Sequence, residues 1–383
     1  MEPGLTTLLG SLKSYLDLPV DRMRTMEPAH YTSQAFFDLE VETIWKKQWI
    51  DVGHVSEIRS PGDFFTVELV GEPLVIVRGP DMAIRALSTV CRYRYMLVVK
   101  PGESGNANRF RCPYHHWTYE LDGKLVQPLH MERHQEFDKN KICLPKFRLE
   151  IWNDLIWVNL DDHAAPLAPT VEALDQAFAP YKCADDWTMT NHYDKVWPGN
   201  WKNFNENNME GYHHMGLHEN TLETYSPTHN TTNITYSDGW TRYQVPYYMD
   251  RQVSRDLIEE VNWKPGDIGQ DVSSLDIVMI HPANAFVIYP GGAGFYALWP
   301  VGVDQVRYRA GSVRPEGELR RYAPDGEAYD SSRALDEDGE SMPYIAMGVR
   351  SAKAAPGYMS WMEEPILRWY QWIARKMLNG EAA

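Results

Sequence analysis

The sequence predicts an α+β fold in which helices come first, an antiparallel β region follows, and strands and helices mix in the C-terminal half. Three observations support this prediction. Apolar residues recur at helical spacing near the N-terminus, short β-rich runs bounded by Gly and Pro follow Trp49, and a longer series of strand-like runs begins at Ile277. With 383 residues, the chain is long enough for about two domains of ~150 residues each.

The composition limits the class of protein. Forty-three per cent of the residues are apolar, with 14 Trp and 22 Tyr, which excludes a disordered chain. No run approaches the ~20 apolar residues that a membrane span needs. The net charge of -16 disfavours nucleic acid as a partner, because phosphates attract clustered Lys and Arg. The N-terminus lacks the basic start and continuous apolar run of a signal peptide, so we expect a cytoplasmic protein.

Two helices are expected before residue 50. The first has apolar residues at helical spacing from Leu5 to Leu16, and Pro19 ends it. The second should run from about Ser33, which is a good N-cap residue, to Gln48. Both helices are expected to pack through their apolar faces.

After these helices the sequence contains short β-rich runs, which begin at Phe64, Pro73, Ala83 and Leu155. An antiparallel β domain accounts for them. It should end near Asp161, where an Ala/Pro-rich stretch is typical of a linker. We therefore expect domains at residues 1–49, 50–160 and 161–383.

The C-terminal half should contain a second sheet and a final helix. Strand-like runs continue from Ile277 to Trp299 and again around Val306 to Val313. The final helix should begin near Ser360, where SWME fits the capping-box pattern, and Gly380 suits its end.

The stretch from Asn200 to His218 has the composition of a metal site. It places five titratable residues within thirteen positions, namely Glu206, Glu210, His213, His214 and His218. Two neutral histidines and a distant carboxylate would form the facial triad that suits non-haem Fe(II) with positions open for O₂. The alternative is a solvated acidic helix that carries scattered histidines.

Helical spacing would place Asn207, Glu210 and His213 on one face. His218 lies five residues after His213, so the helix must bend or end near Gly216 for the two imidazoles to converge. His214 would point away from this face, as a supporting or surface residue.

A second constellation lies in the β region. Cys91 and Tyr93 are followed after 18 residues by Cys112 and His115, on loops that strands should enter. Two cysteines and a histidine supply three of the four ligands of a small iron–sulfur or zinc site. Two unrelated core cysteines are the alternative.

Together these stretches resemble the catalytic α subunit of the Rieske non-haem iron oxygenases, the ring-hydroxylating family. The resemblance covers nearly the whole chain and rests on CPYHHWTYELDG, NWKNFNENNMEGYHHMGLH, CRYR and GDFFTVELVGEPLVIVRG. It implies N-terminal helices that pack on the catalytic domain, an antiparallel β Rieske domain, and a catalytic domain with an antiparallel, helix-grip-like sheet flanked by helices.

The resemblance also implies a 2Fe-2S cluster with ligands Cys91, Cys112, His115 and the residue at position 93. That residue is Tyr93 in this sequence, whereas a Rieske centre owes its high potential to two imidazoles on one iron. An anionic phenolate should lower the potential, and a phenol that does not bind would leave the cluster labile. Tyr95 and His116 stand where the family usually has Gly.

For the mononuclear iron, the resemblance implies the ligands His213, His218 and a C-terminal carboxylate. Asp338 is the residue chosen here, with Asp336 and Glu340 as alternatives. Asn207 is a further candidate catalytic residue. Glu210 would link the iron site to the histidine that corresponds to His115 in a neighbouring subunit. Several family members that act on quaternary ammonium compounds have Glu rather than Asp at that position.

The implied activity is oxygenation of a small organic substrate by O₂, with electrons from NAD(P)H delivered by a separate ferredoxin or flavin reductase. A homotrimer, or an α3β3 assembly, is expected. Apolar and aromatic residues between Ile277 and Trp299 should wall the pocket and favour hydroxylation or dihydroxylation of an aromatic substrate. The alternatives are an oxidative N- or O-demethylase, a quaternary-ammonium monooxygenase, a cluster-free iron enzyme, and a cluster-deficient, non-catalytic homologue.

Overall fold

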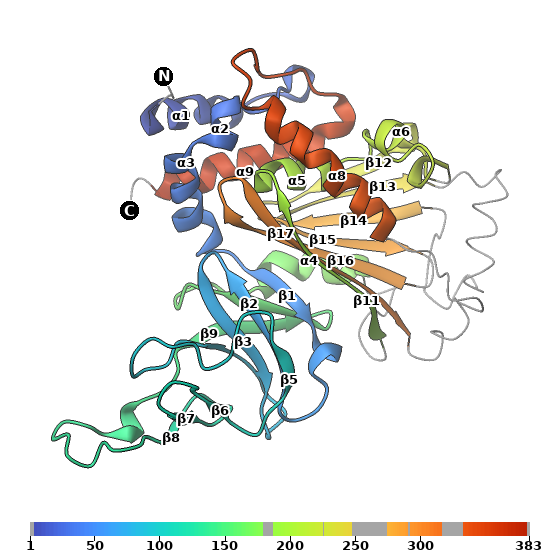
Figure 1. Ribbon diagram of the computed structural model, residues 1–383. Coiled ribbons are helices and arrows are strands. Elements are labelled where there is room, and N and C mark those ends of the chain that lie inside the picture. Colours follow the sequence, from blue (N-terminus) through green and yellow to red (C-terminus); the bar gives the residue numbers. More distant parts are fainter. Residues whose placement is uncertain are drawn as a thin grey trace. The chain divides into compact units, whose positions relative to one another are not determined.

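A computed structural model describes residues 4–178, 187–224, 226–246, 274–289, 292–315 and 332–380. The chain forms two compact units: residues 47–166, and residues 1–46 together with 167–383 (Figure 1). The N-terminal helices therefore share a unit with the C-terminal half. The expected division at residues 49/50 and 160/161 remains a prediction about which parts fold independently.

The unit of residues 47–166 is built on an antiparallel sheet in the order β1-β10-β9-β4-β3-β2-β5. Its strands are β1 (Ile50–His54), β2 (Asp63–Leu69), β3 (Glu72–Arg78), β4 (Ile84–Ser88), β5 (Ser104–Asn106), β9 (Lys146–Trp152) and β10 (Leu155–Asn159). The four expected strands are confirmed as β2, β3, β4 and β10. Sequence analysis missed β9, although Phe147, Leu149 and Ile151 alternate with charged residues along it.

A small antiparallel sheet completes this unit, with β6 (Phe110–Arg111), β7 (Thr118–Tyr119) and β8 (Leu125–Gln127). The side chains of Cys91 and Cys112 belong to the same apolar core as Val75, Leu87 and Trp117. Both cysteines therefore project inward from their loops.

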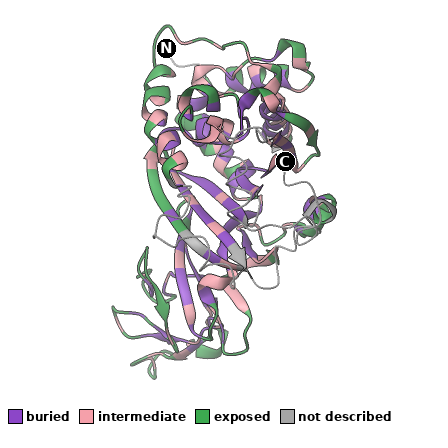
Figure 2. Cartoon of the chain, turned by 90° about the vertical axis from the view of Figure 1, so that its right-hand side faces the viewer, coloured by how far each residue is buried: buried purple, intermediate pink, exposed green. Residues whose placement is uncertain are grey.

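The other unit contains a second antiparallel sheet in the order β11-β17-β16-β15-β14-β13-β12. Its strands are β11 (Trp187–Pro198), β12 (Thr232–Tyr236), β13 (Trp240–Pro246), β14 (Ser274–Ile280), β15 (Asn284–Tyr289), β16 (Gly292–Gly302) and β17 (Gln305–Pro315). The expected C-terminal strands are confirmed as β14 to β17. The central strands β14 to β16 are largely buried, whereas the edge strand β12 is mostly exposed; Figure 2 colours the chain by burial.

Helices pack against this sheet (Figure 1): α5 against β16, α8 against β11 and α9 against β13. The longer helices of the C-terminal half are α4 (Ala168–Phe178), α5 (Trp201–Asn208), α8 (Ser332–Gly348) and α9 (Glu364–Gly380), and a single turn forms α6 (His214–Leu217). An antiparallel sheet with segregated helices makes the fold α+β, as predicted.

The N-terminal segment forms α1 (Leu5–Leu12), α2 (Pro28–Thr32) and α3 (Gln34–Glu40). Ser33 caps α3 as expected, since its side chain accepts the Phe36 N–H. The helix does not reach Gln48: after Glu40 it widens into a π-helical turn and ends at Trp45. The expected capping box is present, because Ser360 and Glu363 satisfy each other's backbone N–H groups ahead of α9.

Buried aromatic rings join the ends of the chain to α5. The Trp201 ring meets Trp45 at 4.8 Å and Trp369 at 5.3 Å, both edge-on. Beside them, Lys202 and Glu40 form an ion pair of 2.7 Å whose side chains have no exposed surface. The start of α5 is therefore fixed on several sides. Among the described residues, no helix is long and apolar enough to cross a membrane.

Candidate functional site

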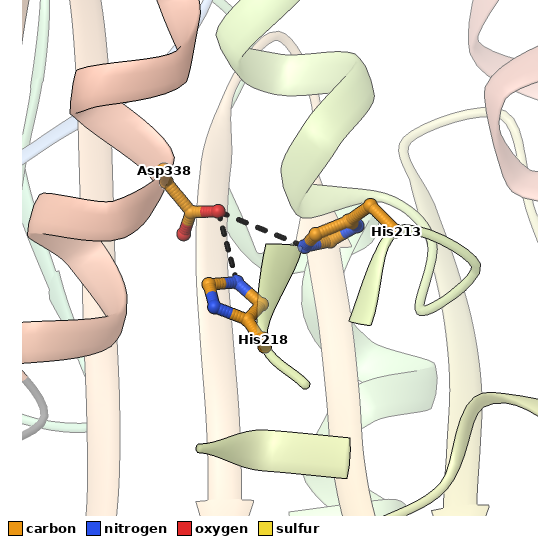
Figure 3. Close-up of side chains that lie close together, drawn as sticks. All are labelled: His213, His218 and Asp338. Carbon is orange, nitrogen blue, oxygen red and sulfur yellow. Dashed lines mark hydrogen bonds and ion pairs between the residues drawn. The ribbon is translucent and has the colours of Figure 1, made fainter. Parts of the chain in front are cut away.

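Three side chains from two segments, the turn of α6 and helix α8, converge in the C-terminal unit (Figure 3). His213, His218 and Asp338 each offer one ligand atom, and these atoms all lie within 4.8 Å of one another. Oδ1 of Asp338 is 3.0 Å from Nε2 of His218 and 3.7 Å from Nε2 of His213. The donor set is two imidazoles and one carboxylate, which suits non-haem Fe(II).

The local backbone brings the two histidines together in an unexpected way. Helix α5 ends at Asn208, and His213 and His218 flank the single turn of α6. Their ring centroids are 5.1 Å apart. The expected shared helical face of Asn207, Glu210 and His213 is therefore wrong, because α5 ends before Glu210. The expected helix end near Gly216 is found at Leu217, the last residue of α6, and this turn brings the two histidines together.

A second carboxylate backs each imidazole at Nδ1. Oε1 of Glu210 is 2.8 Å from Nδ1 of His213, and Oε2 accepts the backbone N–H of the same residue at 3.0 Å. Oε2 of Glu337 is 2.8 Å from Nδ1 of His218. When each Nδ1–H donates to its carboxylate, both Nε2 lone pairs face Asp338 and are free to bind a metal.

These charges shift the imidazole pKa values. Burial lowers the pKa of His213, but the carboxylates of Glu210 and Asp338 together outweigh burial and raise it above its ordinary value. Burial acts in the same sense on His218, where the hydrogen bond and charge of Asp338 raise the pKa. The site therefore attracts positive charge, whether a proton or a metal cation.

Consecutive acidic residues of α8 have different partners. Asp338 faces the histidines, whereas Asp336 accepts hydrogen bonds from the Tyr193 hydroxyl at 2.8 Å and from the Lys195 ammonium. Glu340 is exposed. Because successive helical side chains point ~100° apart, Asp336 and Glu340, each two residues from Asp338, point to other sides of the helix. The geometry brings in Asp338, the residue chosen from the sequence, and neither of its alternatives.

Asn207 also reaches this site, since its Nδ2 donates to Oδ1 of Asp338 at 2.8 Å. His214 is buried rather than on the surface, and its ring lies 4.7 Å from that of His213 and 5.4 Å from that of His218. Burial lowers the pKa of His214 well below its ordinary value, and the two neighbouring imidazoles lower it further. The His214 imidazole is therefore neutral and lies buried beside the two candidate ligands.

Sequence reasoning missed two features of α8. The first is Glu337, which only its place beside Asp338 could have indicated. The second is Gly339, where an added Cβ would lie 2.3 Å from the Trp197 ring. The indole packs against the helix backbone next to Asp338, and its Nε1 donates to the Tyr193 hydroxyl at 3.1 Å.

Tyrosines from the sheet surround the end of α5. The hydroxyls of Tyr243 and Tyr308 donate to the backbone and side-chain oxygens of Asn208, at 3.2 and 3.3 Å. Tyr296 packs against the Tyr308 ring at 6.1 Å. Of these three, only Tyr296 lies between Ile277 and Trp299, the span expected to wall a pocket. Burial raises the pKa values of Tyr243 and Tyr308 well above the ordinary value.

The two cysteine loops of the other unit have the same backbone geometry. Each cysteine N–H donates to the carbonyl five residues later, Met96 or Trp117, at 2.8 Å. Four residues after each cysteine, a residue in the left-handed region donates its N–H back to the cysteine carbonyl. These are Tyr95 at φ +60° and His116 at φ +59°. The loops are therefore a matched pair although their side chains differ.

The side chains of these loops form an incomplete donor set. Cys91 and Cys112 are buried, and burial raises the pKa of the Cys112 thiol, with the Cys91 thiol beside it. The Tyr93 ring lies edge-on to the His115 imidazole at 4.9 Å and stacks on Trp117 at the same distance. The structure thus places a phenol, 41% exposed, beside the one imidazole.

Among the described residues, only His213, His218 and Asp338 bring three such donor atoms within 4.8 Å of one another. The donor atoms of Cys91, Cys112 and His115 are therefore more widely separated. Separated donors suit a two-iron cluster better than one zinc ion. However, a phenol at position 93 does not fit an iron with two histidine ligands. The mononuclear site fits its metal, and the cluster loops do not fit a standard Rieske centre.

Comparison with family models assigns both units. Residues 48–145 match the Rieske [2Fe-2S] domain, and residues 184–379 match the ring hydroxylating alpha subunit (catalytic domain). The chain therefore belongs to the Rieske non-haem iron oxygenase alpha subunits, as the sequence resemblance predicted.

The relatives of known activity include quaternary-ammonium enzymes. The chain is 34% identical to the carnitine monooxygenase oxygenase subunit of Escherichia coli over 49% of its length, and it spans 50% of that relative. It is 26% identical to the glycine betaine monooxygenase oxygenase subunit of Chromohalobacter salexigens over 95% of its length, and it spans 89% of that relative.

Solved structures share the fold. A quaternary ammonium Rieske monooxygenase in complex with L-carnitine superposes with a TM-score of 0.74 at 23% identity, over 93% of this chain and 96% of that one. Naphthalene 1,2-dioxygenase from Rhodococcus sp., bound to indole, gives a TM-score of 0.79 at 18% identity over 99% of both chains. At these identities the likeness concerns the fold alone.

Proposed function

We propose that this chain is the oxygenase subunit of a two-component monooxygenase, with His213, His218 and Asp338 as ligands of one Fe(II). The observation that carries the proposal is the convergence of these three donors with both Nδ1 atoms occupied by carboxylates. Bound iron would supply O₂ activation at its open coordination positions. NAD(P)H would act indirectly, through a ferredoxin or flavin reductase, in the cytoplasm.

The residues around the donors would hold this chemistry in place. Glu210 and Glu337 would each accept an Nδ1–H, which leaves Nε2 of both imidazoles for the metal and fixes the ring planes. Asn207 fixes one oxygen of Asp338 through its amide. The buried ring of His214 limits the access of water from its side.

We propose a quaternary ammonium or related N-methyl compound as the substrate, rather than the aromatic compound favoured by the sequence analysis. The curated relatives act on carnitine and glycine betaine. Glu210 stands where several quaternary-ammonium members have Glu. Tyr243 and Tyr308 lie at the end of α5, where they bond to Asn208 next to Asn207, and aromatic rings attract cations. Oxidative demethylation belongs to the same proposal.

The assembly is also part of the proposal. Glu210 holds His213 within the chain and, by the family resemblance, would face His115 of the partner subunit in a homotrimer. The test is the mass of the purified protein in solution, with and without Glu210→Gln. A monomeric wild type would contradict this part while leaving the metal site intact.

The activity is tested by substrate-dependent O₂ uptake and product analysis with a surrogate reductase. Carnitine, glycine betaine and choline would be compared with benzoate and naphthalene. We expect turnover with a quaternary ammonium compound. Hydroxylation of the aromatic compounds alone would restore the original substrate prediction.

Tyr93 favours a second candidate function, a cluster-deficient protein of the same fold. Iron and acid-labile sulfide per chain separate the cases. About three Fe and two sulfides support the complete oxygenase, one Fe without sulfide supports a cluster-free enzyme, and neither supports a non-catalytic homologue.

A further inference from the structure

We propose that Glu337 is a positioning residue of the metal site, which sets the tautomer and ring plane of His218 and so strengthens metal binding. The inference rests on the proposed function, because it concerns the same site. It adds a residue from α8 that no motif in the sequence assigned.

The first step is the geometry of the imidazole. Nδ1 of His218 lies 2.8 Å from Oε2 of Glu337, and Nε2 lies 3.0 Å from Oδ1 of Asp338. The two nitrogens therefore face two consecutive residues of α8. His218 is only 1% exposed, so water cannot readily replace either partner.

The second step is that Glu337 is itself held in place. The oxygen that meets His218 also accepts the Thr221 hydroxyl at 2.8 Å. The other oxygen lies 3.3 Å from Nε of Arg333, one helical turn earlier. Thr221 belongs to the turn of His218, since its N–H donates to the His218 carbonyl at 3.0 Å. These contacts fix the orientation of the carboxylate.

The third step is the contrast with Glu210. Glu210 lies three residues before its histidine and binds both the ring and the backbone of that residue. Glu337 is 119 residues from His218 in sequence. It therefore links two segments that must both supply ligands, the turn of α6 and helix α8. Glu210 orients a ring within one segment, whereas Glu337 also sets the distance between two.

The chemical consequence follows from hydrogen bonding. A carboxylate that accepts Nδ1–H keeps the proton away from Nε2 and makes Nε2 a stronger donor to a metal. Loss of such a partner typically weakens metal binding by ~10–100-fold. Gln can accept the same hydrogen bond without the charge, so it should retain part of the effect.

The experiment is an anaerobic Co(II) titration of the full-length, metal-free protein, followed by visible absorption. It uses wild type, Glu337→Ala, Glu337→Gln, Thr221→Val and Asp338→Ala. Glu340→Gln is the matched control, because Glu340 is an exposed acid on the same helix. Thermal unfolding of each metal-free variant reports whether the fold is intact.

We expect Glu337→Ala to weaken Co(II) binding by ~10–100-fold and to change the absorption bands of the bound ion, with Glu337→Gln in between. Glu340→Gln should match wild type. A purely structural role would lower the unfolding temperature without changing the bands. If Glu337→Ala fails to fold, Glu337→Gln decides the matter by the same two measurements.

Two failures are distinguishable. Unchanged affinity and absorption in the folded Glu337 variants, with binding lost in Asp338→Ala, would overturn this inference alone. Absence of specific Co(II) binding by wild type, or its persistence in Asp338→Ala, would overturn the proposed iron site and the inference with it.

Discussion

The metal centre and the cysteine loops differ in how their donors are supported. At the metal centre, each imidazole has a carboxylate at Nδ1, and the ligand carboxylate has the amide of Asn207. At the loops, two backbone hydrogen bonds and a left-handed residue are matched, but His115 has the ring of Tyr93 beside it in place of a second imidazole ligand. A matched pair of loop backbones therefore does not ensure a complete donor set.

The largest effect is expected at the metal centre, when one of its three ligands is removed. His213→Ala, His218→Ala or Asp338→Ala should each abolish iron binding at the mononuclear site, because two protein donors do not hold Fe(II) in a facial triad. Iron per chain after anaerobic loading is the measurement. Asp336→Ala and Glu340→Ala are the controls, and both should retain iron. If Asp336→Ala were the damaging variant, the assignment of the carboxylate would be wrong by two residues.

The next effect concerns the cysteine loops, where a substitution can supply the second imidazole. Tyr93→His should yield a reducible cluster, or raise the potential of one already present, since a second imidazole replaces a phenol. Rieske and plant-type clusters differ by ~250 mV or more. With ~59 mV for each tenfold change in a one-electron equilibrium, one imidazole could alter the driving force on the order of a hundred-fold.

The control for this variant is Tyr93→Phe, which retains the ring that stacks on Trp117 and removes only the oxygen. Reconstituted wild type and both variants would be compared by absorbance, potential and sulfide content. A phenolate ligand makes wild type differ from Tyr93→Phe, whereas a non-ligating phenol makes them alike. Identical clusters in all three proteins would show that position 93 supplies no ligand.

A smaller effect concerns the protonation of a buried carboxyl group. Glu206 accepts the hydroxyls of Tyr31 and Tyr370 at 2.7 and 2.9 Å, and burial raises its pKa to about 7. Between the ordinary pKa of a Glu side chain and a pH of about 7, the folded state therefore keeps a proton on Glu206 that the unfolded state has lost. Stability should fall as the pH rises from about 5 to 7, by at most about 1.4 kcal/mol for each pH unit.

Chemical unfolding of wild type and Glu206→Gln across this range measures the effect. The Gln variant should lose most of the slope, because its amide does not titrate. An equal slope in both proteins would assign the pH dependence to other groups, such as the buried pair of Lys202 and Glu40.

The smallest effect concerns the loops. Tyr95 is 86% exposed and holds a left-handed conformation that costs an L-residue ~1–2 kcal/mol. Tyr95→Gly should therefore stabilise the protein by about 1 kcal/mol, measured as a shift in the unfolding midpoint. His116→Gly should gain less, because His116 also has a hydrogen bond with Arg111 at 2.9 Å. A loss of stability in Tyr95→Gly would contradict the assigned strain.

Much of the fold and part of the site could be predicted from the sequence. Strands such as β3 and β14 alternate or bury apolar residues continuously, and Ser33 and Ser360 are caps with local hydrogen-bond partners. His213 and His218 stood out because titratable residues rarely cluster without a function. These features depend on residues close together in the chain.

The rest depended on contacts between distant segments. The end of α5 at Asn208 could not be predicted, because Glu210 and His213 have helical spacing while their actual contact forms in a turn. The role of Glu337 requires the position of α8 relative to His218. The exclusion of Asp336 depends on its contact with Tyr193, across 143 residues of sequence.

Gly339 has a consequence for how the ligand carboxylate is chosen. The indole of Trp197 leaves room for no side chain at this point of α8. A shift of the helix by one residue in either direction would bring Asp338 or Glu340 against that ring. The absence of a side chain at Gly339 therefore fixes the register of α8. In this register Glu337 and Asp338 face the histidines, whereas Asp336 bonds to Tyr193 and Glu340 is exposed.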